Sequence, residues 1–286
     1  MDIRFLTLKI GFEEKDVERI LYLDTLFPEM KELSKKAFEE KFAEIDKLLL
    51  EKETPEVSIR ELRLLFLSHS FVRLYGVYLE NGYTEELYYG AANDLVSKAR
   101  ECFKMHGEMG IRPFPWFENW FKLKRFTLGR LQYGIDKTYP LEAYEKCGYK
   151  VDKGDFVLDC HIPADGPLTE ELCFESYRLA YDFFKNRFPD GVMRVVCSTW
   201  LFTPAHLHVL GKNSQRFASD FDIVYTTTSD NFDEGWRVFN QIDMSDPDSL
   251  PVETSMQKRF VEYMKSGGKF GSGYGVFFFD GEKILK

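Results

Sequence analysis

The first third of the chain has the hydrophobic spacing of amphipathic helices. Between residues 33 and 49, apolar side chains recur every three to five positions with lysine and glutamate between them, which predicts a helix with one buried face. Residues 59–78 are apolar on nearly every side, as expected of the central helix of a bundle. Thr84 is a suitable cap for a third helix, whose apolar positions continue to Cys102. This part of the chain is therefore predicted to be a helical bundle.

An aromatic segment follows the predicted bundle. Residues 110–120 contain two prolines and five bulky apolar side chains, a composition that suits a packed junction better than a free linker. We expect Phe114, Trp116 and Trp120 to pack the helical region onto the next domain, because three large rings would otherwise expose an apolar patch. The predicted domains are residues 1–115, which are helical, and residues 116–286.

The second half changes to an alternation of apolar and polar residues, which is the pattern of strands. The alternation occurs at residues 126–135 and again at residues 156–162, whereas residues 169–188 return to a helical spacing. A buried strand is predicted at residues 193–202, followed by a helix that starts at Thr203 and Pro204. Two more strands are predicted at residues 221–227 and 236–239, around a polar turn at residues 228–231. The last predicted elements are a helix that begins with a capping box of Thr254 and Gln257 and a hairpin that turns at Asp280 and Gly281. The predicted fold class is α+β.

The charge of the chain argues against polyanionic partners. The sequence has 47 acidic and 38 basic residues and a net charge of -9, so long-range electrostatics would repel nucleic acids and anionic membrane surfaces. The sequence has no uncharged apolar run long enough to span a bilayer, and the first residues do not read as a secretory signal. The expected partner is a small-molecule substrate, and the expected compartment is the cytoplasm. No sequence pattern indicates an oligomeric state.

Neither the cysteines nor the histidines have the spacing of a metal site. The five cysteines are scattered, odd in number and without a C-x-x-C pair, which argues against a disulfide framework and against a cysteine zinc site. We expect reduced and mostly buried thiols. Only His206 and His208 lie close together, and a spacing of two would point them to different faces of a helix. No metal cofactor is predicted.

A set of separated sequence blocks runs through the second half. The blocks are residues 125–133 (RFTLGRLQY), residues 161–168 (HIPADGPL), Ser176, residues 183–184, residues 188–189 and residues 197–201 (CSTWL). In this order they resemble a bacterial family of N-acyltransferases with a helical N-terminal domain and a GNAT-like C-terminal domain. The resemblance implies a mixed sheet flanked by helices. It also implies an acyltransferase that moves an acyl group from an acyl-CoA-like thioester to an amine or another small nucleophile. The alternative is a non-catalytic module that retains a GNAT-like cleft to bind a small molecule or a peptide.

The resemblance also implies where the donor would bind. In GNAT folds, the pantetheine arm of acyl-CoA lies where the fourth and fifth strands splay apart, and the pyrophosphate meets backbone N–H groups at the start of the following helix. The strands correspond to residues 156–162 and 193–202, as parallel neighbours. Residues 163–171 depart from the usual R/Q-x-x-G-x-G/A loop, because they hold one glycine and three acidic residues. We therefore expect CoA to bind weakly or not at all through residues 163–171. Phosphate contacts are expected instead from Lys122, Lys124 and Arg125.

His161 is the first candidate for a catalytic role, because it lies at the exit of the predicted fourth strand on the same face as Asp159. It could act as a general base or donate a hydrogen bond to the acyl carbonyl, with Asp159 as its orienting partner. It could equally hold the turn at Pro163. Tyr133 could give a proton to the leaving thiolate, although its position also suits the core. The candidate residues for binding the substrate or the cofactor are Arg130, Gln132, Ile162, Gly166, Ser176, Cys197, Ser198 and Trp200.

Residues 267–275 form a glycine-rich segment with one lysine, Lys269. Backbone N–H groups of such a segment can cradle an anion, but the segment matches neither the P-loop nor the dinucleotide-binding motif. We expect it to stop a helix and to form a flexible turn into the last strand.

Overall fold

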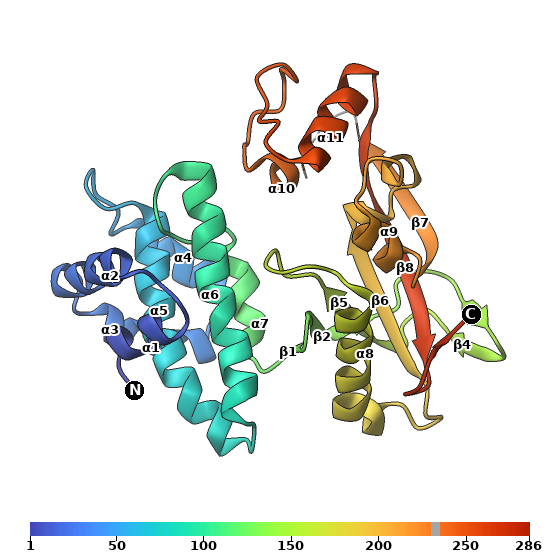
Figure 1. Ribbon diagram of the computed structural model, residues 1–286. Helices are drawn as coiled ribbons and strands as arrows, with labels where there is room; N and C mark the ends of the chain where they lie inside the picture. Colours follow the sequence, from blue (N-terminus) through green and yellow to red (C-terminus); the bar gives the residue numbers. More distant parts are fainter. Residues whose placement is uncertain (230–234) are drawn as a thin grey trace. The chain divides into compact units, whose positions relative to one another are not determined.

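The structure is a computed structural model that describes residues 1–229 and 235–286. It divides into two compact units, Met1–Thr127 and Leu128–Lys286 (Figure 1). The first unit is helical, and the second is a mixed sheet flanked by helices. The fold class is therefore α+β, as predicted. None of the described helices is both long and apolar enough to cross a membrane.

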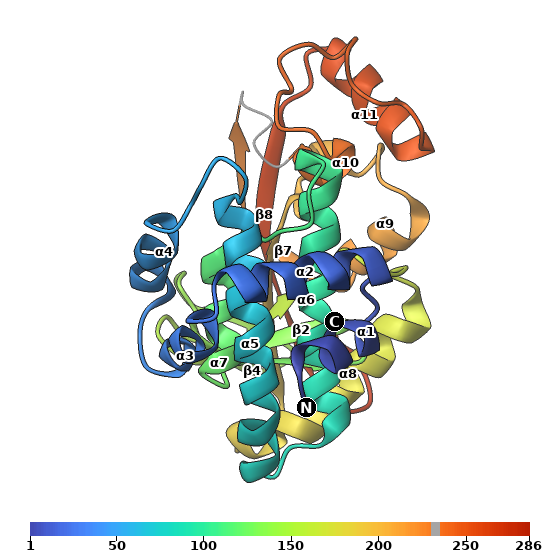
Figure 2. The same cartoon turned by 90° about the vertical axis from the view of Figure 1, so that its left-hand side faces the viewer.

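The helical unit is built around two long helices, α5 and α6. A capping box of Ser58 and Glu61 starts α5, and Thr84 caps α6 as predicted. Figure 2 shows α2 lying across α5, where the guanidinium of Arg19 in α2 pairs with Glu61 at 2.8 Å. The helices of this unit are α1 (Ile3–Lys9), α2 (Glu14–Leu26), α3 (Met30–Leu33), the 3-10 helix η1 (Ser34–Phe38), α4 (Phe42–Leu50), α5 (Ile59–Glu80), α6 (Glu85–His106), the 3-10 helix η2 (Phe114–Phe117) and α7 (Glu118–Phe121).

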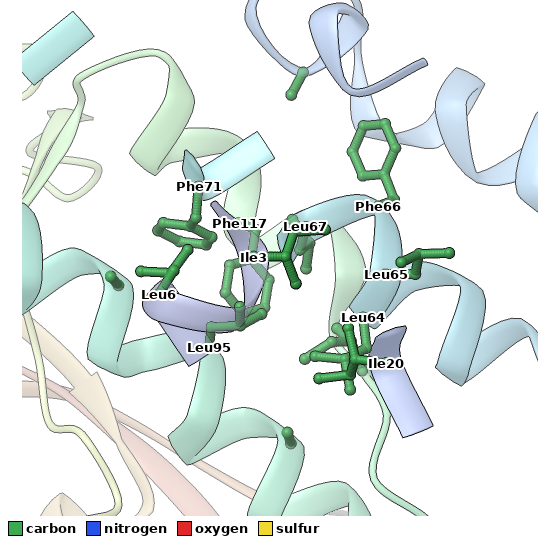
Figure 3. Packing of buried hydrophobic residues seen from close by; sticks show 14 of the residues in the cluster. Ile3, Leu6, Ile20, Leu64, Leu65, Phe66, Leu67, Phe71, Leu95 and Phe117 are labelled. Atoms are coloured by element: carbon green, nitrogen blue, oxygen red, sulfur yellow. The ribbon is translucent and has the colours of Figure 1, made fainter. Parts of the chain in front are cut away.

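The core of the helical unit forms around α5, which is the predicted central helix. Figure 3 shows Phe71 of α5 near Leu6 of α1 and Phe117 of η2. Phe66 of α5 points away from them and packs on the rings of Phe42 in α4 and Phe114 in η2. The helix predicted at residues 33–49 is instead divided among α3, η1 and α4. The reason is visible in the spacing, because the buried residues Ala37 and Phe42 are five positions apart and a continuous helix repeats every three to four. The chain turns between them, and each residue is buried from its own short helix.

The aromatic segment belongs to the core of the helical unit. Phe114, Phe117 and Trp120 are fully buried there. Asp94 of α6 accepts hydrogen bonds from the indole N–H of Trp116 at 2.6 Å and from that of Trp120 at 3.1 Å. The rings of Phe114 and Trp120 are therefore part of the core of the helical unit, and Trp116 is half-buried against it. Polar anchoring of indole groups explains how such rings are buried without losing their hydrogen bonds.

A sheet of seven strands has the order β1-β2-β5-β6-β8-β7, with β9 paired to β8, and all of its strands except most of β1 lie in the second unit. As predicted, β5 and β6 are parallel neighbours, and α8 connects them along the chain. The strands are β1 (Arg125–Leu128), β2 (Leu131–Thr138), β3 (Tyr144–Lys146), β4 (Tyr149–Val151), β5 (Phe156–His161), β6 (Met193–Thr199), β7 (Asp222–Ser229), β8 (Phe270–Phe279) and β9 (Ile284–Leu285). The helices are α8 (Glu170–Phe184), η3 (Lys185–Arg187), η4 (Trp200–Phe202), η5 (Pro204–His206), α9 (Lys212–Ala218), α10 (Trp236–Phe239) and α11 (Ser255–Lys265).

The two faces of this sheet are covered differently. Helix α8 lies along one face (Figure 1), where the ring of Tyr177 packs on Phe277 of β8 with centroids 4.9 Å apart. The other face carries an apolar cluster that includes Val196 of β6 and Val276 of β8. The short hairpin of β3 and β4 adds Val151 to this cluster. That hairpin was not predicted, because three-residue strands are too short to show an alternation.

The helix at the capping box of Thr254 and Gln257 and the terminal hairpin are confirmed. The strand predicted at residues 126–135 is divided into β1 and β2 by a turn at Gly129, whose φ is +68°. The strand predicted at residues 236–239 is wrong, since these residues form α10. A short apolar run is compatible with either a strand or a helix. Here the left-handed backbone conformation of Asn240 caps the C-terminus of a helix.

Two further predictions are corrected at the end of β6. The strand predicted at residues 193–202 ends at Thr199, after which η4 begins. The helix expected at Thr203 and Pro204 is only the single 3-10 turn η5. Part of the polar turn predicted at residues 228–231 lies outside the described residues.

Candidate functional site

The central feature of the sheet is the place where β5 and β6 stop pairing. Their register partners are Leu158 with Val195 and Asp159 with Val196. Both strands continue past this point, β5 to His161 and β6 to Thr199. Beyond it, β6 remains paired with β8 as far as Thr199, which lies opposite Gly273. The strand ends that follow the last β5–β6 pair are therefore the edges that the resemblance predicted for a pantetheine arm.

The continuation of β6 is held against β8 by a close contact with glycine. A Cβ atom added to Gly273 would lie 2.6 Å from Cβ of Phe202, and one added to Gly275 would lie 2.8 Å from the Phe202 ring. Since Phe202 is fully buried, η4 packs directly on the backbone of β8. The glycine-rich segment is thus largely part of β8, and the expected flexible turn at residues 271–275 is wrong. The expected helix stop is present at Gly267, which has a φ of +81°.

Alternation along the strands places two of the three catalytic candidates, His161 and Asp159, on the face of the sheet away from α8. His161 lies opposite Gln132 of β2, and Asp159 lies opposite Gly134. Ser198, two residues beyond Val196 on β6, points to the same side. The sequence-predicted residues Gln132, Asp159, His161 and Ser198 therefore share one face where the two strands part.

Two residues that the sequence analysis did not single out also belong to this face. A Cβ atom added to Gly134 would lie 3.4 Å from Oδ1 of Asp136 and 3.7 Å from Oδ2 of Asp159, so glycine gives these carboxylates room. Tyr274 of β8 lies opposite Ser198. Burial and the charge of Asp159 raise the pKa of Tyr274, which keeps its hydroxyl protonated at neutral pH. The sequence feature that could have identified Tyr274 is the alternation of glycine with other residues in the glycine-rich segment, which is the pattern of a strand.

Two thiols occupy the opposite face, toward α8. Cys160 and Cys197 follow the last β5–β6 pair by one residue each, and both are buried. Burial and the neighbouring thiol of Cys197 raise the pKa of Cys160 well above its usual range. Cys160 is therefore a neutral thiol, which is poorly nucleophilic.

Tyr133 and Ser176 form a buried connection between β2 and α8. The Ser176 hydroxyl donates to the carbonyl of Leu128 and accepts from the N–H of Leu131 at 3.2 Å. Its one proton is therefore used, so the Tyr133 hydroxyl, 3.1 Å away, is the donor in their shared hydrogen bond. Burial raises the pKa of Tyr133 well above its usual range.

The loop between β5 and α8 is tied to Arg130. The Nη2 atom donates to the carbonyls of Pro163 and Gly166 at 2.9 and 2.8 Å, and Nε donates to that of Pro167 at 2.9 Å. Ile162 links β5 to this loop and is half-buried. At the other end of the loop, Thr169 caps α8 by accepting from the N–H of Leu172.

Trp200 stands in an aromatic cluster just past the end of β6. Its half-buried ring packs on Phe260 of α11 and Phe270 of β8, with centroids 5.6 and 5.8 Å apart. His206 is fully buried beside it, with Nδ1 2.9 Å from the carbonyl of Trp200 and Nε2 3.3 Å from that of Lys269. Burial lowers the pKa of His206.

The predicted phosphate-binding cluster lies at the end of the helical unit. Lys122 donates from Nζ to the carbonyl of Phe38 at 2.7 Å. Arg125 is buried, donates to the carbonyl of Trp116 at 3.0 Å and places its guanidinium 3.4 Å from the centroid of the Trp116 ring. Lys124 is exposed. Among the described residues, no group of three or more His, Cys, Asp or Glu side chains is arranged to hold a metal ion.

Comparisons with known proteins define the family. A model of the N-acyltransferase N-terminal domain matches residues 1–123, and a model of the GNAT-like C-terminal domain matches residues 125–277. The chain therefore belongs to the N-acyltransferase family that combines these two domains. A search of curated protein sequences finds no match.

Solved acyltransferase structures share the fold. An acyltransferase in complex with decanoyl-CoA has 18% identity and a TM-score of 0.72, with 96% of this chain and 86% of that chain covered. An acyltransferase in complex with decanoyl-CoA and teicoplanin has 16% identity and a TM-score of 0.66, with both chains fully covered. A third, in complex with CoA and 10C-teicoplanin, has 16% identity and a TM-score of 0.65, with 96% and 99% covered.

Proposed function

We propose that the protein transfers an acyl group from acyl-CoA to an amine. The observation that carries this proposal is the parting of β5 and β6 beyond Asp159 and Val196, with α8 joining the two strands. A pantetheine arm can lie along strand edges that leave a ladder and pair with their backbone as an added strand would. The acyltransferases of the same fold that were crystallised with decanoyl-CoA or CoA support this donor.

The transfer requires one bond to form and one to break at the thioester carbonyl. The amine nitrogen attacks the carbonyl carbon, and the tetrahedral intermediate collapses with loss of the CoA thiolate. The proton that leaves the amine ends on a base, and the thiolate takes up a proton. Backbone N–H groups at the parted strands would stabilise the carbonyl oxygen as its charge develops.

We assign the acceptor amine to the face that carries His161 and Asp159. His161 would take the proton from the attacking amine, and Asp159 would orient the acceptor. The two residues stand on the same face of β5 at its outer end, next to the position of the thioester in this account. The nearby carboxylate of Asp136 favours an acceptor that arrives as an ammonium ion.

The test is a transfer assay with decanoyl-CoA and a panel of aliphatic, aromatic and sugar amines, read by thiol release and by the mass of the acylated product. The account expects decanoyl-CoA to bind and at least one amine to be acylated. His161→Gln should lower the rate of thiol release by roughly 10²–10⁴-fold, with little change in the Kd of decanoyl-CoA.

The matched control is His208→Gln, which changes an exposed histidine outside this face. It should leave the rate unchanged. Absence of decanoyl-CoA binding would contradict the proposed donor. Binding without transfer to any amine of the panel would instead support the alternative, a non-catalytic binding module.

A further inference from the structure

Arg130 makes an unusual set of contacts for a charged side chain. All three of its hydrogen bonds go to carbonyl oxygens of the loop after β5. Among the described residues, it forms no ion pair with a carboxylate. Burial lowers the pKa of the Arg130 guanidinium, but arginine remains protonated at neutral pH. A positive charge is thus held directly behind this loop.

The three contacts fix the direction of the peptide groups in the loop. In a trans peptide, the N–H points away from the carbonyl oxygen of the same peptide plane, and the described chain contains no cis peptide bond. Since the carbonyls of Pro163 and Pro167 point to Arg130, the N–H groups of Ala164 and Leu168 point away from it. Neither N–H donates a hydrogen bond to another described residue.

The acidic residues near the loop oppose an anion less than their number suggests. Glu170 forms an ion pair with Arg216, with Oε1 2.9 Å from Nη2. This contact lowers the pKa of Glu170 and offsets its negative charge locally. Asp165 and Glu171 are exposed, where water screens their charge. The loop also leads into the N-terminus of α8, whose dipole favours an anion.

We propose that Arg130 is a positioning residue for the pyrophosphate of the acyl-CoA donor, holding residues 163–168 so that the N–H groups of Ala164 and Leu168 face the phosphates. In this arrangement, the hydrogen bonds of the guanidinium hold the loop in a conformation for which the usual R/Q-x-x-G-x-G/A loop relies on additional glycines. The inference rests on the proposed function, because it assumes acyl-CoA as the donor. It reverses the expectation that this loop binds CoA weakly.

The test compares two donors that differ only in the nucleotide, decanoyl-CoA and S-decanoyl-pantetheine. Both carry the arm that would lie between the strands, but only decanoyl-CoA carries the pyrophosphate. Arg130→Lys keeps the charge and loses the fork that reaches three carbonyls. It should weaken the binding of decanoyl-CoA by about tenfold or more, the size expected for lost hydrogen bonds to a charged group. The Kd of S-decanoyl-pantetheine should change by less than about twofold on this basis.

Arg194→Lys is the matched control. Arg194 also donates to carbonyl oxygens, those of Lys150 and Val192, but it stands at the start of β6 away from the loop. This variant should leave both constants unchanged. Limited proteolysis separates positioning from direct contact, because Arg130→Lys should speed cleavage within residues 163–169 even without a ligand. Unchanged cleavage with weaker decanoyl-CoA binding would overturn positioning in favour of a direct phosphate contact.

Other outcomes are also decisive. Equal weakening of both donors, or no weakening of decanoyl-CoA, would overturn the inference. If the unmodified protein binds neither donor, the proposed function fails instead. Should Arg130→Lys not fold, Gly166→Ala perturbs the same loop, because Gly166 has a φ of +86° that alanine adopts only with strain. Gly166→Ala should weaken the binding of decanoyl-CoA but not that of S-decanoyl-pantetheine. A Kd for decanoyl-CoA equal to that of the unmodified protein would count against the inference.

Discussion

The hydroxyl of Tyr133 on β2 donates a hydrogen bond across 3.1 Å to Ser176 of α8, whose own proton is committed to the carbonyl of Leu128. This buried contact ties the helix between β5 and β6 to the neighbouring strand. Because both groups already have partners inside the unit, the geometry favours a structural role for Tyr133 over donation to a leaving thiolate.

We predict that Tyr133→Phe lowers the free energy of unfolding by about 1 kcal/mol, because Ser176 loses one buried donor. Acyl transfer at 25 °C should be retained. Tyr181→Phe is the control, since its hydroxyl donates to the carbonyl of Gly191 at 3.1 Å in a less buried contact. Denaturant unfolding measures the first effect and thiol release the second. A stable Tyr133→Phe variant without transfer activity would restore Tyr133 as the proton donor.

The contact between Phe202 and the glycines of β8 predicts a steric effect. Gly275→Ala places a Cβ atom 2.8 Å from the Phe202 ring and from Cβ of Phe221, so it should destabilise the protein by about 1–3 kcal/mol through overpacking. Adding Phe202→Leu should restore part of the loss. Gly76→Ala is the control, because Gly76 lies in α5 with open space around it. That change should stabilise by about 0.5–1 kcal/mol, and equal effects of the two alanines would refute the steric account.

The two hydrogen bonds that Asp94 accepts should stabilise the aromatic segment of the helical unit. Asp94→Ala would leave the buried indole N–H of Trp120 and the half-buried indole N–H of Trp116 without this acceptor. The expected loss is about 1–3 kcal/mol for each buried donor left unpaired. Asp94→Asn keeps one acceptor oxygen and should lose less. Thermal unfolding followed by tryptophan fluorescence measures both variants, and equal stability of Asp94→Ala and the unmodified protein would contradict the role.

Burial lowers the pKa of His206 relative to the unfolded chain. The unfolded state therefore takes up the proton first as the pH falls, so the contribution of neutral His206 to stability is present above about pH 6.5 and is lost progressively below it. The nearby His208 adds to this effect when charged. His206→Gln should flatten the fall in stability between pH 7 and pH 5, measured by denaturant unfolding at each pH. An unchanged pH profile would show that other groups dominate.

Much of the fold was predictable because local sequence patterns determine it. The apolar run of α5, the cap at Thr84 and the capping box of Thr254 and Gln257 are signals confined to one element, and all are confirmed. The neighbouring β5 and β6 were predicted only through the family resemblance, since strand order depends on contacts distant in sequence. Short apolar runs failed at residues 236–239, where the same side chains suit a helix or a strand.

The candidate site shows the same limit. The alternation of β5 correctly places Asp159 and His161 on one face, because a strand repeats every two residues. The contacts of Arg130 could not be predicted, since they join the turn between β1 and β2 to a loop more than thirty residues away. The acidic residues of the segment 163–171 also suggested more negative charge than the loop has, because Glu170 pairs with Arg216. These two residues are distant in the sequence and meet only in the folded chain.

Hydrogen exchange with and without decanoyl-CoA tests the central claim, that acyl-CoA binds where β5 and β6 part. At a saturating concentration, the account predicts slower exchange in residues 158–169 and 196–201. Residues 276–285 of β8 and β9 should be unaffected. Protection confined to other parts of the chain, or no protection at a concentration shown to saturate binding, would contradict the claim.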